Sequence, residues 1–189
     1  LPNYGVFDEY RYFRPGHRYP LLTVRDVKIG VNICEDIWFS EGPTRSQALA
    51  GAEVIVNINA SPYHKGKGRE RQTMLSERAK QNNVIISYTN AVGGQDELVF
   101  DGQSMIIDGN GRLITSGRQF EEDLLVVDIR VPDRKPIIPK SSEKHFEAID
   151  QVVISEKAGP KKKPLPPRRA VKAFPLCEEV YRALVLGTR

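Results

Sequence analysis

The stretch VKIGVNICEDIW (27–38) decides the fold prediction, because it joins a strand pattern to a group of reactive side chains. Its first seven residues are rich in β-branched side chains, which predicts a buried strand over 27–33. Cys34 follows this strand, and two carboxylates, Glu35 and Asp36, come directly after it. Strand ends that open into loops are where α/β folds place reactive groups, so Cys34 is a candidate nucleophile. The alternative is that Cys34 is a small buried residue at a strand end.

The rest of the first 131 residues alternates between strand and helix patterns. Further strands are predicted at 52–60, 84–92 and 124–131, helices at 43–50 and 69–83, and a hairpin at 103–117. The order β-α-β-α-β, followed by antiparallel strands, predicts a mixed sheet with helices on one face. The apolar residues on the other face of the sheet must pack against a further layer of the protein. The predicted fold class is therefore α+β.

The region 134–173 differs from the preceding chain in charge and in proline content. Residues 134–172 hold 11 Lys and Arg against 4 Asp and Glu, although the net charge of the whole chain is only +4. The rest of the chain is therefore mildly acidic, which argues against a nucleic-acid-binding protein. Prolines disfavour regular structure, so 134–173 is predicted as a linker in which 143–154 could form a short helix. This divides the chain into a domain over 1–133, the linker, and a helical element over 174–189.

Composition narrows the class of protein further. The 189 residues are 40% hydrophobic and 28% charged, which is typical of a soluble globular protein. No run approaches the ~20 apolar residues of a membrane-spanning helix. Cys34 and Cys177 share no spacing typical of a disulfide framework or a metal site, which favours a reducing cytoplasm and no bound metal. The first residue is Leu1 and the last stretch ends within an apparent helix, so we expect an interior piece of a longer protein.

Four longer motifs occur in a fixed order along the chain. They are LPNYGVFDEYRYF (1–13), VNICEDIW (31–38), NINASPYHKGK (57–67) and NAVGGQDELVFDGQS (90–104). Together they resemble the amidase domain of the glutamine-dependent NAD synthetase family, which belongs to the nitrilase superfamily. The resemblance covers residues 1 to about 133 and resumes at 174–189, which is similar to the start of the synthetase domain. It implies the α-β-β-α sandwich of that superfamily, truncated at its N-terminus and followed by a Pro/Lys-rich linker and a C-terminal helix.

The resemblance also implies roles for five residues. The family uses a Glu-Lys-Cys triad, and Cys34 matches its nucleophile, whereas the triad glutamate and lysine match nothing in this chain. We therefore expect the chain alone to be catalytically incomplete. Tyr4, Ser61 and Lys67 match glutamine-binding positions, and Glu35 could accept a hydrogen bond from the substrate. Without the resemblance, Tyr4 is a packed aromatic residue, Ser61 starts a turn, and Lys67 belongs to a solvated basic loop.

The activity implied by the resemblance is hydrolysis of glutamine through a cysteine thioester. The ammonia would then serve the amidation of deamido-NAD to NAD by a synthetase domain that uses ATP and Mg²⁺, while the amidase step needs no cofactor. We expect a cytoplasmic homo-oligomer with no nucleic-acid or membrane partner. One alternative is a stand-alone nitrilase-type amidase acting on another small amide, against which GGQDELVFDG and EEVYRALVLGTR argue. Another is a non-catalytic interaction module with a basic linker, which lacks the interleaved aromatics that stack on bases.

Overall fold

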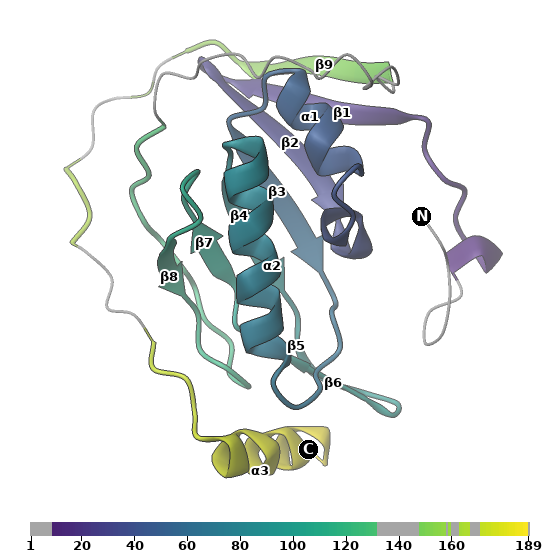
Figure 1. The fold of residues 1–189 in the computed structure, drawn as a ribbon, viewed down its shortest axis with the longest axis vertical. Helices are drawn as coiled ribbons and strands as arrows, with labels where there is room; N and C mark the ends of the chain where they lie inside the picture. The colour runs from purple at the N-terminus through teal and green to yellow at the C-terminus, as the bar shows by residue number, and fades with distance from the viewer. Residues whose placement is uncertain (1–8, 132–147, 158, 160–162, 167–170, 189) are drawn as a thin grey trace.

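A computed structural model describes residues 9–131, 148–157, 159, 163–166 and 171–188 (Figure 1). Its central sheet contains β1 (Arg18–Val24), β2 (Val27–Ile33), β3 (Val54–Asn59), β4 (Ile85–Asn90), β7 (Met105–Ile107), β8 (Leu113–Ser116) and β9 (Ala148–Ser155). These seven strands lie in the order β8-β7-β4-β3-β2-β1-β9. A separate two-stranded ribbon is made of β5 (Val92–Gln95) and β6 (Leu98–Asp101). The described part of the chain is therefore a mixed sheet with a small antiparallel ribbon beside it.

The helices cover one face of the sheet and one end of the ribbon. They are η1 (Glu9–Arg11) and η2 (Cys34–Trp38), which are 3-10 helices, and α1 (Pro43–Leu49), α2 (Lys67–Asn82) and α3 (Leu176–Gly187). Figure 1 shows α1 and α2 side by side on the same face of the sheet and α3 below the ribbon. Pro43 suits the start of α1, because its fixed φ is helical and the first turn needs no N–H donor. None of the described helices is long and apolar enough to cross a membrane.

Strands β2, β3 and β4 run parallel and bring their carboxyl ends to one edge of the sheet. The register places Asn32 beside Asn57 and Asn57 beside Tyr88. The connections between these strands pass through α1 and α2 on the same face, as right-handed crossovers do. Side chains that leave the ends of these strands therefore meet at a single edge.

The core lies between the sheet and the two covering helices. Its fully buried members include Leu21, Ile37, Ala52, Ile55, Leu75, Ala79, Val84, Ile86 and Ile107. Because side chains alternate along a strand, the neighbours of the inward residues point to the opposite face. There Ile33 is 67% exposed and Ile58 is 53% exposed. The described residues therefore cover one face of the sheet and leave aliphatic side chains on the other.

Most predicted elements are confirmed, including the strand at 27–33, both crossover helices, the hairpin and the C-terminal helix. The strand expected at 124–131 is wrong, since these residues pair with no described strand. No side chain of this segment is buried, so burial does not favour adding it to the sheet, and Asp128 Oδ2 instead accepts a hydrogen bond from Leu165 N at 2.6 Å. The domain boundaries at 133 and 174 stay predictions.

The helix considered for 143–154 is also wrong over its described part. Residues 148–155 form β9, which pairs in parallel with β1. Its run of Val152, Val153 and Ile154 has the β-branched character that favours strands.

Candidate active site

Cys34 occupies the sharp turn between β2 and η2, at the shared carboxyl edge. Its φ is +44°, in the left-handed region that a residue with a β-carbon seldom adopts. Asp36 Oδ2 accepts a hydrogen bond from Ile33 N at 2.9 Å, and the Cys34 carbonyl accepts one from Asn57 Nδ2 at 3.4 Å. The Cys34 side chain is half-buried and forms no disulfide. A residue on such a strand-to-helix turn presents its side chain above the sheet, as a nucleophile requires.

Burial affects the acid that closes this turn. It raises the pKa of Asp36, and the hydrogen bond from the Ile33 N–H partly offsets that rise. Glu35 is half-buried in the first turn of η2, directly after the nucleophile candidate. The sequence motif of a cysteine followed by two carboxylates thus forms a compact turn, in which the Asp36 carboxylate is bonded to the Ile33 N–H.

Buried amide side chains lie beneath the Cys34 turn. Asn57 Nδ2 donates to Asn32 Oδ1 at 2.8 Å, and Asn59 Nδ2 donates to Asn57 Oδ1 at 2.7 Å. Asn32 Nδ2 in turn donates to Thr44 Oγ1 at 3.0 Å and Gln47 Oε1 at 3.2 Å in α1. We call these five residues the amide ladder. It ties β2, β3 and α1 together under the turn, and sequence analysis missed it although asparagines at inward strand positions were a visible signal.

Ser61 lies two residues beyond β3 and is 5% exposed. Its backbone N–H donates to Asn90 Oδ1 at 2.8 Å, and its carbonyl accepts from Arg71 Nη2 at 3.0 Å. Arg71 Nη1 also pairs with Asp101 Oδ1 at 2.7 Å, with both side chains fully buried. Burial raises the pKa of Asp101, while the charge of Arg71 opposes that rise. The backbone at Ser61 is therefore fixed by β4 and α2, and Asp101 of β6 holds the Arg71 side chain in place.

Tyr88 lies near the end of β4, beside Asn57 in the register, and is buried at the same edge of the sheet. It is 1% exposed, and burial raises its pKa to about 12, against the opposing influence of Arg71 and of the Ser61 side chain. The structure thus brings Cys34, Ser61 and Tyr88 together at the carboxyl edge. No motif pointed to Tyr88, because its role depends on this tertiary approach.

Lys67 begins α2 and is only 17% exposed along its side chain. Its Nζ lies 4.1 Å from the centroid of the Trp38 ring and 3.2 Å from Glu70 Oε2. Trp38 ends η2, the helix that starts at Cys34. Lys67 is therefore packed against the nucleophile's own helix rather than held in a solvated loop.

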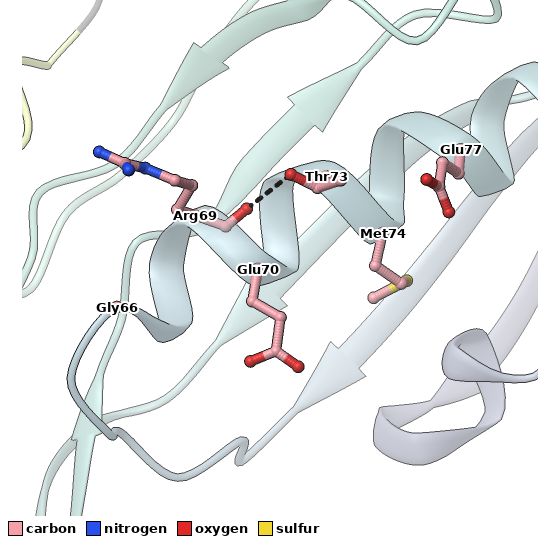
Figure 2. A pocket seen from close by; sticks show the side chains of 6 residues that line it. All are labelled: Gly66, Arg69, Glu70, Thr73, Met74 and Glu77. Atoms are coloured by element: carbon pink, nitrogen blue, oxygen red, sulfur yellow. Dashed lines mark hydrogen bonds between the residues drawn. The ribbon is translucent and has the colours of Figure 1, made fainter.

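A groove along α2 does not coincide with this site. Figure 2 shows that it is lined by Gly66, Arg69, Glu70, Thr73, Met74 and Glu77. Neither Cys34 nor Ser61 contributes to it, and Thr73 Oγ1 donates to the Arg69 carbonyl at 3.0 Å within the helix.

The predicted substrate contact Tyr4 lies outside the described residues. Among those described, no three His, Cys, Asp or Glu side chains cluster as metal ligands would.

Comparison with known proteins gives a consistent set of similarities. The profile of the carbon-nitrogen hydrolase family matches residues 1–138. The glutamine-dependent NAD(+) synthetase of Aquifex aeolicus is 50% identical over 135 residues, which are 71% of this chain and 24% of that protein. The enzyme of the same name from Thermotoga maritima is 41% identical over 201 residues, covering 100% of this chain and 34% of that protein. The chain thus spans about a quarter to a third of the length of these relatives.

Two solved structures are similar to this chain in three-dimensional fold. The glutamine-dependent NAD+ synthetase from Acinetobacter baumannii, in complex with ADP, has a TM-score of 0.75 at 33% identity. That match covers 100% of this chain and 30% of the other. A carbon-nitrogen hydrolase from Helicobacter pylori G27 has a TM-score of 0.56 at 25% identity, over 64% of this chain and 47% of the other.

Proposed function

Because the chain belongs to the carbon-nitrogen hydrolase family, we propose that it supplies the cysteine nucleophile of a glutamine-hydrolysing site. The same match and the two solved structures show the expected α+β fold of the nitrilase superfamily. The observation that carries the proposal is the position of Cys34 on a left-handed turn at the carboxyl end of β2, with Ser61 two residues beyond the adjacent parallel strand β3. Glutamine is the amide favoured by the names of the most similar relatives.

The proposed reaction passes through a thioester. The Cys34 thiolate attacks the side-chain amide carbon of glutamine, and the C–N bond breaks as the nitrogen is protonated and leaves as ammonia. Water then hydrolyses the thioester to glutamate. The general base and the lysine that stabilises the oxyanion are expected outside this chain, so we expect the chain alone to be inactive.

Four residues are proposed to bind the substrate. Ser61, whose backbone is fixed by Arg71 and Asn90, offers a hydroxyl at the same carboxyl edge of the sheet as Cys34. Lys67 offers a cation to the α-carboxylate, a charge-assisted contact that would replace its bond to Glu70. Glu35 accepts from a substrate N–H group, and Tyr4 forms a wall of the side-chain pocket.

We further propose that the chain is part of a two-domain enzyme. Ammonia released at Cys34 would be used for ATP-dependent amidation of deamido-NAD to NAD, with Mg²⁺, by a domain that begins near α3. The support is the name shared by the relatives and the ADP complex of the Acinetobacter baumannii enzyme. A cytoplasmic homo-oligomer without nucleic-acid or membrane partners fits this assignment.

The test uses the full-length polypeptide that contains this chain. Cys34→Ala is expected to abolish NAD formation from glutamine and to leave NAD formation from ammonium ion within about twofold, since only the thioester step needs the thiol. Cys177→Ala, at the exposed cysteine of α3, is the matched control and is expected to keep both activities. Equal loss of both activities in Cys34→Ala would contradict the proposal, as would glutamine turnover by the 189-residue chain at a rate near that of the full-length protein.

A further inference from the structure

Helix α3 contributes a buried carboxylate to the loop that carries Ser61 and Lys67. Glu179 is 9% exposed, and its Oε1 accepts a hydrogen bond from Gly66 N at 3.3 Å. Gly66 has a φ of +83° and immediately precedes Lys67, the first residue of α2. Glu179 thus contacts the backbone at the left-handed position that sets the start of α2, from 113 residues further along the chain.

The middle of the same loop is held by contacts of Tyr63. Glu179 lies beside the Tyr63 hydroxyl, and burial together with this carboxylate raises the pKa of Tyr63 to about 12. The Tyr63 ring packs edge-on against Phe120 with centroids 5.3 Å apart, and Tyr63 N donates to Val99 O at 2.7 Å. Loop 61–67 is therefore held between the β5–β6 ribbon and α3.

The helix that presents Glu179 is itself fixed in place. A β-carbon on Gly94 would lie 3.3 Å from the Gly187 Cα, so the end of α3 packs backbone against backbone on β5. Arg182 pairs with Glu121 at 3.7 Å, which ties α3 to the segment after β8, whereas its pair with Glu178 at 2.9 Å lies within the helix and does not set the position of α3. Figure 1 shows α3 below the ribbon, away from the face that α1 and α2 cover. Glu179 therefore has a defined position relative to the loop.

The two ends of the loop are held by different parts of the chain. Ser61 is fixed by Arg71 and Asn90, both within residues 1–138 that match the hydrolase family, whereas Gly66 is contacted by Glu179 from outside that match. We propose that Glu179 is a positioning residue that aligns loop 61–67, so that Lys67 reaches its working position only when α3 is docked. For the glutamine contact itself, this inference rests on the proposed function.

The test compares Glu179→Met, Glu179→Gln and Glu178→Met in the full-length polypeptide. Methionine keeps the side-chain length but removes the acceptor, glutamine keeps an oxygen that accepts from Gly66 N, and Glu178→Met makes the same change at the preceding position. Hydrogen exchange of peptides over 61–67 is expected to be about tenfold faster in Glu179→Met and near wild type in the other two variants. Peptides over β3 and β4 report on the whole fold in the same samples.

Steady-state kinetics provide the second readout. Glu179→Met is expected to raise the KM for glutamine several-fold with kcat within about twofold, because the residue positions a binding loop and does not touch the reacting atoms. Loop exchange equal to that of Glu178→Met, or rising only in step with β3 and β4, would overturn the inference. A wild-type protein that hydrolyses no glutamine would overturn the proposed function instead, and the exchange comparison would still decide the role of Glu179.

Discussion

The two faces of the central sheet differ in chemistry where β2 and β3 end. On the helix-covered face, Asn32 and Asn57 are buried at 4% and 0% exposure. On the opposite face, Ile33 and Ile58 are 67% and 53% exposed. Polar side chains are thus buried and aliphatic ones are exposed, the reverse of the usual distribution. Near the site, the buried asparagines are accommodated by hydrogen bonds, whereas the exposed isoleucines belong to a face that the described residues leave uncovered.

The burial of the asparagines and the exposure of the isoleucines have different physical causes. A buried amide without partners would be unfavourable, but each member of the amide ladder has a partner in β2, β3 or α1. The aliphatic face has the pattern of a sheet surface that packs against a second layer. The α-β-β-α sandwich expected from the sequence would place a second sheet there.

The largest effect is expected at the buried ion pair on the covered face. Arg71→Ala leaves Asp101 without its partner in a fully buried position and should lower the free energy of unfolding by about 3–5 kcal/mol. Arg69→Ala, on the exposed side of the same helix, should change it by less than about 0.5 kcal/mol. Urea denaturation of both variants measures the difference. Similar values for the two would show that the ion pair does not anchor this face.

The next comparison uses two isoleucines on opposite faces of β3. Ile55→Ala removes a fully buried side chain and should destabilise the chain by about 2–5 kcal/mol. Ile58→Ala removes a side chain that is 53% exposed and should lower stability by less than about 1 kcal/mol. Urea denaturation of both variants measures the difference in the free energy of unfolding. A loss at Ile58 as large as that at Ile55 would mean that the second face is covered in solution.

A smaller effect is expected within the amide ladder. Asn57→Leu leaves Asn32 Oδ1 without its donor and should lower the free energy of unfolding by about 1–3 kcal/mol. Thr89→Val, at an exposed position beside Ile58 in the register, is the matched control and should have an effect below about 0.5 kcal/mol. Thermal unfolding monitored by circular dichroism compares the two. Equal midpoints would mean that the ladder adds no stability to the covered face.

The smallest expected effect is at the turn where the two faces meet. Glycine adopts a φ of +44° without steric strain, so Cys34→Gly should be about 1 kcal/mol more stable than Cys34→Ala. At Cys177, within α3, the order should reverse, with glycine about 1 kcal/mol less stable than alanine. Urea titration of the four variants measures both differences. The same sign at both positions would argue against backbone strain at Cys34.

The elements predicted correctly from the sequence are those with a strong local pattern. Strands β2, β3 and β4 and helices α1 and α2 have periodic apolar residues bounded by breakers. In contrast, β1 and β9 stabilise each other across a long separation, as the Arg18–Asp150 ion pair at 2.8 Å across 132 residues illustrates. A local pattern cannot reveal such a partner.

The residues of the candidate site also divide into those marked by local sequence motifs and those placed by contacts between distant segments. Cys34 and Ser61 were identified because motifs mark them, and the structure places both at the carboxyl edge. Tyr88, Asn57 and Glu179 were missed, since each acts through a contact made only when distant segments approach. Sequence reasoning thus found the groups that could react, and the structure added those that hold them.

Strand β9 also affects how the molecule avoids self-association. Without it, β1 would present a row of unpaired N–H and C=O groups, a template for edge-to-edge aggregation. With β9 in place, the strand that forms this edge of the sheet is β9, whose Val152, Val153 and Ile154 are 44%, 60% and 58% exposed. Asp150 within β9 and the exposed Lys157 just beyond it place charges on this edge, and charged side chains disfavour pairing with a further strand.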